Sequence, residues 1–269
     1  MLKDITLGQY FPVDSVIHKL DPRFKIINTL LFIMMLFAGN HAVNLVIGAV
    51  FVILVQGLSK IPFQMGIKSI KPIFPVLVFT AILNLVFIDT GETLWSWKFL
   101  KITEGGLQTS AFMIGRIILL IIGSSMLTYT TSPILLTDAI ESLLSPLKKV
   151  KFPVHEMAMM MSIALRFIPT LIEETDKIMA AQKARGAMLD NGKLLDRVKA
   201  MIPILIPLFV SAFRRAEELA TAMECRCYQG GEGRTRLREL KATWKDYCSL
   251  TVCGLFLLLI MILNSIISY

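Results

Sequence analysis

The chain has 269 residues, of which 55% are hydrophobic and only 18% are charged, and its mean hydropathy is +0.66. This composition excludes an ordinary soluble domain and is typical of polytopic membrane proteins. The net charge is +8, but residues 131–246 hold 18 of the 28 basic residues together with 14 of the 20 acidic ones. Because acids are interleaved with bases, this block does not indicate nucleic-acid binding.

Five stretches are predicted to cross the bilayer. Residues 26–58 are almost wholly apolar and exceed the length of one span of about 20 residues. The break at Gly39-Asn40-His41 favours a hairpin of two short spans, and one long tilted helix is the alternative. The remaining spans are expected at about 72–88, 107–129 and 247–267.

The charges predict the orientation of these spans. Lys60, Lys68 and Lys71 make residues 59–71 a basic loop, which the positive-inside rule places in the cytosol. Trp95 and Trp97 in the loop 89–106 suit the outer interface. The fold class is therefore all-α: a polytopic membrane helical bundle of about five spans, with long amphipathic cytoplasmic helices. We expect a membrane region at 1–130, cytoplasmic helices at 131–246 and a final span at 247–269, with the amino terminus inside.

Arg116 is the one charged residue within a predicted span. A charge inside a membrane marks a candidate functional site. The alternative is a structural arginine that snorkels outward or pairs with a carboxylate such as Glu104.

Two long helices are predicted in the charged block, at about 154–188 and 194–228, and both end on the same small pattern. The first ends on Ala184, Arg185 and Gly186, and the second on Cys225, Arg226 and Cys227. Small residues let another backbone approach, while the guanidinium offers forked donors to carboxylates or carbonyls. An arginine that merely complements the helix dipole is the alternative. The pattern predicts two docking points for a partner.

The sides of these helices offer further candidates. Met157, Met160, Met161 and Ala164 are candidate contacts with a partner membrane protein, because methionines repack readily, although they are equally compatible with a core. Alanine stripes at Ala180, Ala181, Ala184 and Ala187 and at Ala212, Ala216 and Ala220 predict that the two helices cross.

No pattern in the chain predicts enzyme activity. The nearest approach to a nucleotide-binding loop, Gly186 to Gly192-Lys193, has five intervening residues where four are needed and lacks the following Ser or Thr. Cys225 and Cys227 have no histidine nearby in the sequence, so a metal site is not expected. We also expect no disulfide, because a cytosolic location keeps thiols reduced.

The run TTSPILLTDAIESLLSPLKKVKFPVHEMAMMMSIALRFIPTLIEETDKIMAAQKARG, together with LDPR at Leu20 to Arg23, resembles the T component of energy-coupling factor transporters. The resemblance implies a non-catalytic scaffold in the bacterial cytoplasmic membrane. Its implied partners are two ATPases of the ABC type, which bind the ATP and Mg²⁺, and a small integral-membrane protein that binds the substrate. Arg185 matches the docking motif of the family fully, and Arg226 matches it only at the arginine.

The implied substrates are several vitamins in a shared system, or cobalt, nickel or biotin in a dedicated one. A membrane scaffold that recruits a soluble complex without transport is the competing hypothesis. A secondary transporter is a third, but inverted repeats and polar mid-membrane residues are expected of it.

Overall fold

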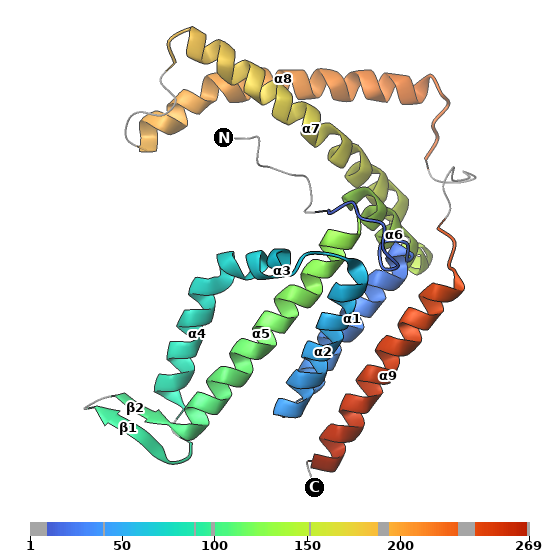
Figure 1. Ribbon diagram of the computed structural model, residues 1–269. Coiled ribbons are helices and arrows are strands. Elements are labelled where there is room, and N and C mark those ends of the chain that lie inside the picture. The colour runs from blue at the N-terminus through green and yellow to red at the C-terminus, as the bar shows by residue number, and fades with distance from the viewer. Residues whose placement is uncertain are drawn as a thin grey trace. The chain divides into compact units, whose positions relative to one another are not determined.

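The computed structural model describes residues 10–39, 41–88, 90–97, 100–150, 152–187, 194–230 and 240–267. Within these ranges the chain forms nine α-helices, two short 3-10 helices and one β-hairpin (Figure 1). Contacts divide it into two units. We call the described residues of Gly8–Leu136 and Leu240–Tyr269 the membrane unit, and those of Thr137–Glu239 the crossed-helix unit.

The membrane unit contains the apolar helices. They are α1 (Pro22–Ala38), α2 (Ala42–Ser59), α3 (Phe63–Ile70), which continues through a 3-10 turn at Lys71–Ile73 into α4 (Phe74–Phe87), α5 (Glu104–Thr130) and α9 (Trp244–Ile267). Four segments are long and apolar enough to cross a membrane in the described part of the chain: α2, Phe63–Phe87, α5 and Trp244–Ile266. With its 17 residues, α1 is at the lower limit of spanning length. The five predicted spans correspond to these four segments and α1.

The break between α1 and α2 confirms the predicted hairpin. Helix α1 ends at Ala38 and α2 begins at Ala42, so the alternative of one long tilted helix is wrong. Asp21 caps α1 by accepting a hydrogen bond from the backbone N–H of Arg23, and Pro22 occupies the first helical position.

Two predicted loops contain regular structure instead. Residues 63–70 of the basic loop form α3, which fits between Pro62 and Pro72 and contains Gly66 in its interior. The loop at 89–106 contains strands β1 (Thr93–Trp97) and β2 (Leu100–Thr103), paired antiparallel with Trp97 opposite Leu100. Alternating Thr, Trp and Ile residues favour strands, so the helical bundle carries one small hairpin that the all-α prediction lacked.

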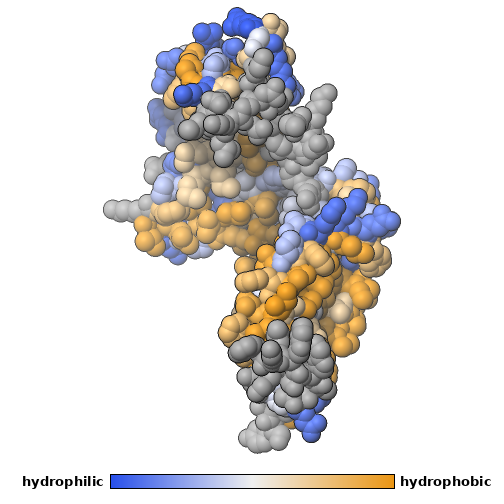
Figure 2. Space-filling model, turned by 90° about the vertical axis from the view of Figure 1, so that its left-hand side faces the viewer, coloured by the Kyte–Doolittle hydropathy of each residue, from blue (hydrophilic) through white to orange (hydrophobic). Residues whose placement is uncertain are grey.

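The core of the membrane unit lies where α1, α2, α5 and α9 meet. Phe32 stacks on Phe51 with ring centroids 5.5 Å apart, and Phe51 contacts Phe256 edge-on at 5.3 Å. Gly123 of α5 faces the ring of Phe32, where any Cβ would overlap it. The missing side chain thus lets α5 approach α1 closely. Outward, the spanning helices present a broad apolar surface, as expected of helices that face lipid (Figure 2).

The crossed-helix unit consists of most of α6 (Pro133–Leu144), a 3-10 helix at Ser145–Val150, α7 (Val154–Ala184) and α8 (Leu194–Glu224). Nδ1 of His155 lies 3.1 Å from the carboxylate of Glu141, which joins the start of α7 to α6. The two long helices cross, and their carboxyl ends lie at different ends of the pair (Figure 1).

Candidate docking site

The carboxyl end of α7 is closed by a Schellman motif. Arg185 is the C-cap, Gly186 follows with φ +87°, and the N–H of Gly186 donates to the carbonyl of Lys183 at 3.0 Å. The N–H of Ala187 reaches back to the carbonyl of Gln182, also at 3.0 Å. These two bonds satisfy carbonyls that the helix leaves free, and the left-handed residue between them is the position that favours glycine.

The carboxyl end of α8 has the same local structure. The N–H of Cys227 donates to the carbonyl of Glu224 at 2.9 Å, and the N–H of Tyr228 donates to that of Met223 at 3.0 Å. Cys227 takes the left-handed conformation with φ +55°, so Arg226 corresponds to Arg185 and Cys227 to Gly186. The shared small-Arg-small pattern therefore encodes one backbone turn that occurs twice.

Both turns present their arginine to the surroundings. Each of the six predicted docking residues is exposed: Ala184, Arg185, Gly186, Cys225, Arg226 and Cys227. In the described part of the chain neither guanidinium has an acidic partner. Each helix end thus combines exposed carbonyls, the negative end of the helix dipole and a forked donor. This combination suits a polar cleft that supplies both donors and acceptors.

Polar contacts hold α7 and α8 together at their crossing. Arg215 donates to the carboxylate of Glu174 at 2.6 Å, and Nε2 of Gln182 donates to the carbonyl of Pro203 at 3.4 Å. Pro207 has no N–H, so the carbonyl of Pro203, four residues earlier, receives no hydrogen bond within α8. This carbonyl can therefore accept from Gln182. The kink-forming proline of one helix thereby creates an acceptor for the other.

The alanines that predicted the crossing are mostly turned outward. Ala180, Ala181, Ala184, Ala216 and Ala220 are exposed, whereas Ala187 and Ala212 are half-buried. The polar contacts between the helices are instead the ion pair of Arg215 with Glu174 and the hydrogen bond to the carbonyl of Pro203. The spacing of alanines does not predict either contact.

An apolar surface runs along both long helices. On α7, Met160, Met161 and Ala164 are exposed, whereas Met157 is half-buried. The apolar surface of α8 is larger and was missed as a candidate from the sequence; its exposed side chains are Met201, Ile202, Leu205, Ile206, Phe209, Val210 and Phe213. The spacing of 202, 206, 209 and 213 is the helical signal that could have identified it. Phe213 is 72% exposed, so this surface is free to bind another apolar surface.

Arg116 makes contacts within the chain that point to a structural role. Its Nη2 donates to the carbonyl of Gly39 at 2.5 Å, and its guanidinium lies over the ring of Phe112 at 4.6 Å. Glu104, the partner considered from the sequence, accepts instead from Gln108. Arg116 therefore ties α5 to the break between α1 and α2 through the free carbonyl at the end of α1.

The LDPR segment forms a polar clamp. The carboxylate of Asp21 binds the guanidinium of Arg23 at 2.8 Å, and the same guanidinium donates to the carbonyl of Leu240 at 2.8 Å. The N–H of Asp21 donates to Asp246 at 2.7 Å, and Asp246 also accepts from Thr243. The clamp thus joins the start of α1 to the start of α9.

Known proteins match the chain over nearly its full length. The CbiQ family, described as cobalt transport protein, matches residues 14–237. The energy-coupling factor transporter transmembrane protein EcfT of Clostridium kluyveri is 53% identical over 268 residues, which cover 99% of this chain and 98% of the relative. EcfT of Bacillus subtilis is 49% identical over 246 residues, which cover 91% and 93%.

The agreement extends across both the membrane unit and the crossed-helix unit. The chain therefore belongs to the CbiQ/EcfT family, the non-catalytic transmembrane components of energy-coupling factor transporters.

Proposed function

We propose that this multi-pass membrane protein couples ATP hydrolysis by two ABC-type ATPases to uptake through a small substrate-binding membrane protein. The observation that carries the proposal is the repeated turn at Arg185 and Arg226. Two exposed helix ends with the same backbone turn fit two similar binding clefts, one on each ATPase. In this arrangement ATP and Mg²⁺ belong to the ATPases.

The proposed orientation rests on the distribution of charges. The crossed-helix unit is exposed and rich in both signs of charge, so it belongs on the aqueous side that holds the ATPases. The positive-inside rule then places the amino terminus and the α2–α3 connection, with Lys60, in the cytosol of a bacterial cell.

The apolar surface of α8, together with Met160, Met161 and Ala164, is the proposed seat of the substrate-binding protein. An integral-membrane partner has an apolar surface of its own to bury there, which would stabilise contact by about 25 cal/mol per Å². Methionine and kinked helix segments can adapt to more than one such partner.

Several vitamins, delivered by exchangeable binding proteins, are the proposed substrates, as the resemblance to the T component of a shared system implies. A dedicated cobalt, nickel or biotin system is the second candidate, favoured by the description of the matching family as a cobalt transport protein. The family membership favours both over a scaffold without a transport role.

The test is purification of the tagged chain from its host in mild detergent, followed by mass spectrometry of the bound proteins. We expect two ABC-type ATPases, and several small membrane proteins if the system is shared or one if it is dedicated. Arg185→Glu and Arg226→Glu should each reduce the ATPase yield, whereas Arg214→Glu, an equal change on the exposed side of α8, should not. ATPase yields that are the same in all three variants would contradict the docking role.

A further inference from the structure

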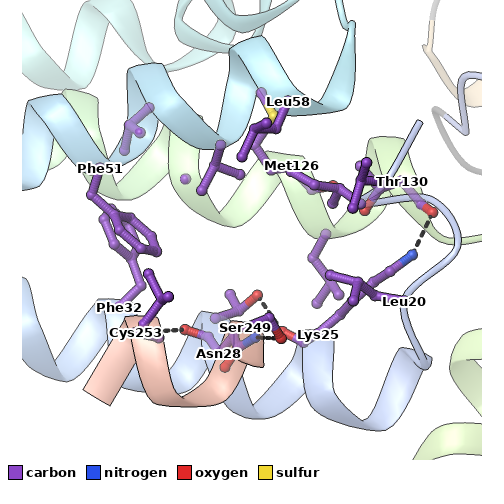
Figure 3. A pocket seen from close by; sticks show the side chains of 18 of the residues that line it. Leu20, Lys25, Asn28, Phe32, Phe51, Leu58, Met126, Thr130, Ser249 and Cys253 are labelled. Atoms are coloured by element: carbon purple, nitrogen blue, oxygen red, sulfur yellow. Dashed lines mark hydrogen bonds between the residues drawn. The ribbon is translucent and has the colours of Figure 1, made fainter. Parts of the chain in front are cut away.

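A cavity of about 480 Å³ lies inside the membrane unit, between α1, α2, α5 and α9 (Figure 3). Phe32, Phe51 and Met126 are among its mainly apolar lining. Leu58 and Val252 also line it and are 58% and 48% exposed, so the cavity reaches the outer surface of the unit. Because these helices are expected to span the membrane, we expect that surface to face lipid.

A second pocket of about 380 Å³ adjoins the first and shares Val16, Leu58 and Lys245 with it. Its lining also includes Lys19 and Lys60. Asp14, the one acid among the described residues of that lining, is 3.6 Å from Lys19. Over the described ranges neither Lys60 nor Lys245 has an ion-pair partner, so two exposed ammonium groups are available to an anion.

The two pockets follow one another along the helix axes. Lys60 is the C-cap of α2, and Lys245 lies in the first turn of α9, so both mark the same end of the bundle. From Lys245 to Cys253, which lines the deeper part beside Phe32, α9 rises about 12 Å. A ligand that filled both pockets would have its anionic group at the helix ends and its apolar part inside the bilayer.

Buried Lys25 lines the cavity, but its ammonium group has no N–H left to donate to a ligand. Its Nζ donates to the carbonyl of Thr130 at 2.9 Å (Figure 3). It also donates to the carbonyl of His18 at 3.2 Å and lies 3.4 Å from Oγ1 of Thr131. All three N–H groups are therefore occupied by protein oxygens. Direct contacts with an anion fall to Lys60 and Lys245.

We propose that these two pockets together bind one anionic phospholipid, with an acyl chain in the cavity between α1, α2, α5 and α9 and the phosphate at Lys60 and Lys245. The apolar cavity suits hydrocarbon, and the two exposed lysines at its mouth suit a negatively charged group. A bound lipid would fill the space between α2 and α9 and thereby support the core at Phe32 and Phe51. This site does not include the helix ends at Arg185 and Arg226. The lipid proposal can therefore be tested independently of ATPase docking.

The experiment is native mass spectrometry of the purified full-length chain, titrated with phosphatidylglycerol or with phosphatidylcholine of the same acyl chains. Lys60→Glu/Lys245→Glu removes the proposed phosphate contacts. Lys68→Glu/Lys71→Glu is the matched control, because both lysines are exposed near the same end of α2 but line neither pocket. Val252→Trp fills the cavity from its rim.

We expect the wild type to bind one phosphatidylglycerol in preference to phosphatidylcholine. The Lys60/Lys245 variant should lose about 25-fold in affinity for phosphatidylglycerol, a factor of about five for each lysine, and the control less than about fivefold in total. Val252→Trp should weaken both lipids.

Three results would overturn the proposal. Equal losses in the two double variants would indicate diffuse attraction to a basic surface. Unchanged binding by Val252→Trp would place the acyl chain outside the cavity. Displacement of the lipid by millimolar inorganic phosphate would reduce the site to one for a free anion.

Discussion

Gly186 and Cys227 occupy equivalent positions after the C-caps of α7 and α8, and both have positive φ. A residue with a Cβ is strained there by about 1–2 kcal/mol, whereas glycine is not. We therefore expect Cys227→Gly to stabilise the end of α8 by about 1 kcal/mol and Gly186→Ala to destabilise the end of α7 by a similar amount.

Amide hydrogen exchange of the last turn of each helix measures both effects, with Cys225→Ala, one residue before the C-cap, as the control. No atom lies within 4 Å of a Cβ built on Gly186, so a clash cannot account for a loss. Faster exchange in Cys227→Gly would contradict the shared Schellman turn.

Arg116 is expected to act on stability. Arg116→Leu removes the hydrogen bond to the carbonyl of Gly39 and the contact with Phe112, at an expected cost of about 2 kcal/mol. Thermal unfolding of the purified chain measures the loss, and uptake per folded molecule should stay at the wild-type level. Unchanged unfolding with abolished uptake would instead make Arg116 a transport residue.

His18 is expected to make the stability of the membrane unit depend on pH. Its pKa is lowered from 6.5, first by burial and then by the nearby Lys25 ammonium. Its Nε2 donates to the carbonyl of Phe11 at 2.9 Å, and Nδ1 lies 2.7 Å from Oγ of Ser15, an arrangement that suits the neutral ring. The unfolded chain therefore binds more protons as pH falls below about 6.5, so stability present at pH 8 is lost on acidification.

Replacing His18 should remove this part of the pH dependence. In thermal unfolding at pH 8.0 and pH 5.5, we expect His18→Gln to show a smaller difference in midpoint than the wild type. His41→Gln serves as the control. An equal difference in the wild type and His18→Gln would show that other groups cause the acid sensitivity.

At the scale of whole helices, Pro207 is expected to matter for coupling. Pro207→Ala restores a donor for the carbonyl of Pro203, which then bonds within α8 and no longer accepts from Gln182. Removing a proline from a helix interior favours the helix by up to about 3 kcal/mol. We expect higher thermal stability but slower ATP-driven uptake, since the crossing contact is lost.

Pro203→Ala is the matched control for this prediction. It supplies a donor to the carbonyl of Lys199, which accepts no hydrogen bond from α7 among the described residues, so uptake should change less. Equal losses of uptake in the two variants would mean that helix stiffness, and not the Gln182 contact, sets the rate.

The features predictable from the sequence are those that nearby residues determine. Gly39-Asn40-His41 interrupts an apolar run, which predicted the α1–α2 break. The small residues beside Arg185 and Arg226 indicated two equivalent helix ends. Contacts between distant segments could not be read in this way: Arg116 finds the carbonyl of Gly39, 77 positions earlier. The hairpin at 93–103 was missed because its strands are short and lie among turn residues.

At the scale of the whole molecule, transport should require both helix ends. Arg185→Glu/Arg226→Glu is predicted to abolish uptake while the chain reaches the membrane in normal amount, because two charges that would face acceptors are reversed. Vitamin uptake by cells, with membrane content measured by immunoblot, tests this. Normal uptake in the double variant would contradict the proposal that these helix ends couple ATP hydrolysis to transport.

The most direct measurement is site-specific photo-crosslinking from the second helix end. Cys225 and Cys227 are exposed thiols there, and Cys253 is buried, so after Cys248→Ser a benzophenone maleimide should label chiefly the turn around Arg226. Illumination in native membranes is predicted to give an adduct that mass spectrometry identifies as an ABC-type ATPase, lost in Arg226→Glu. An ATPase adduct that persists in Arg226→Glu, or its absence from the intact transporter, would contradict the account.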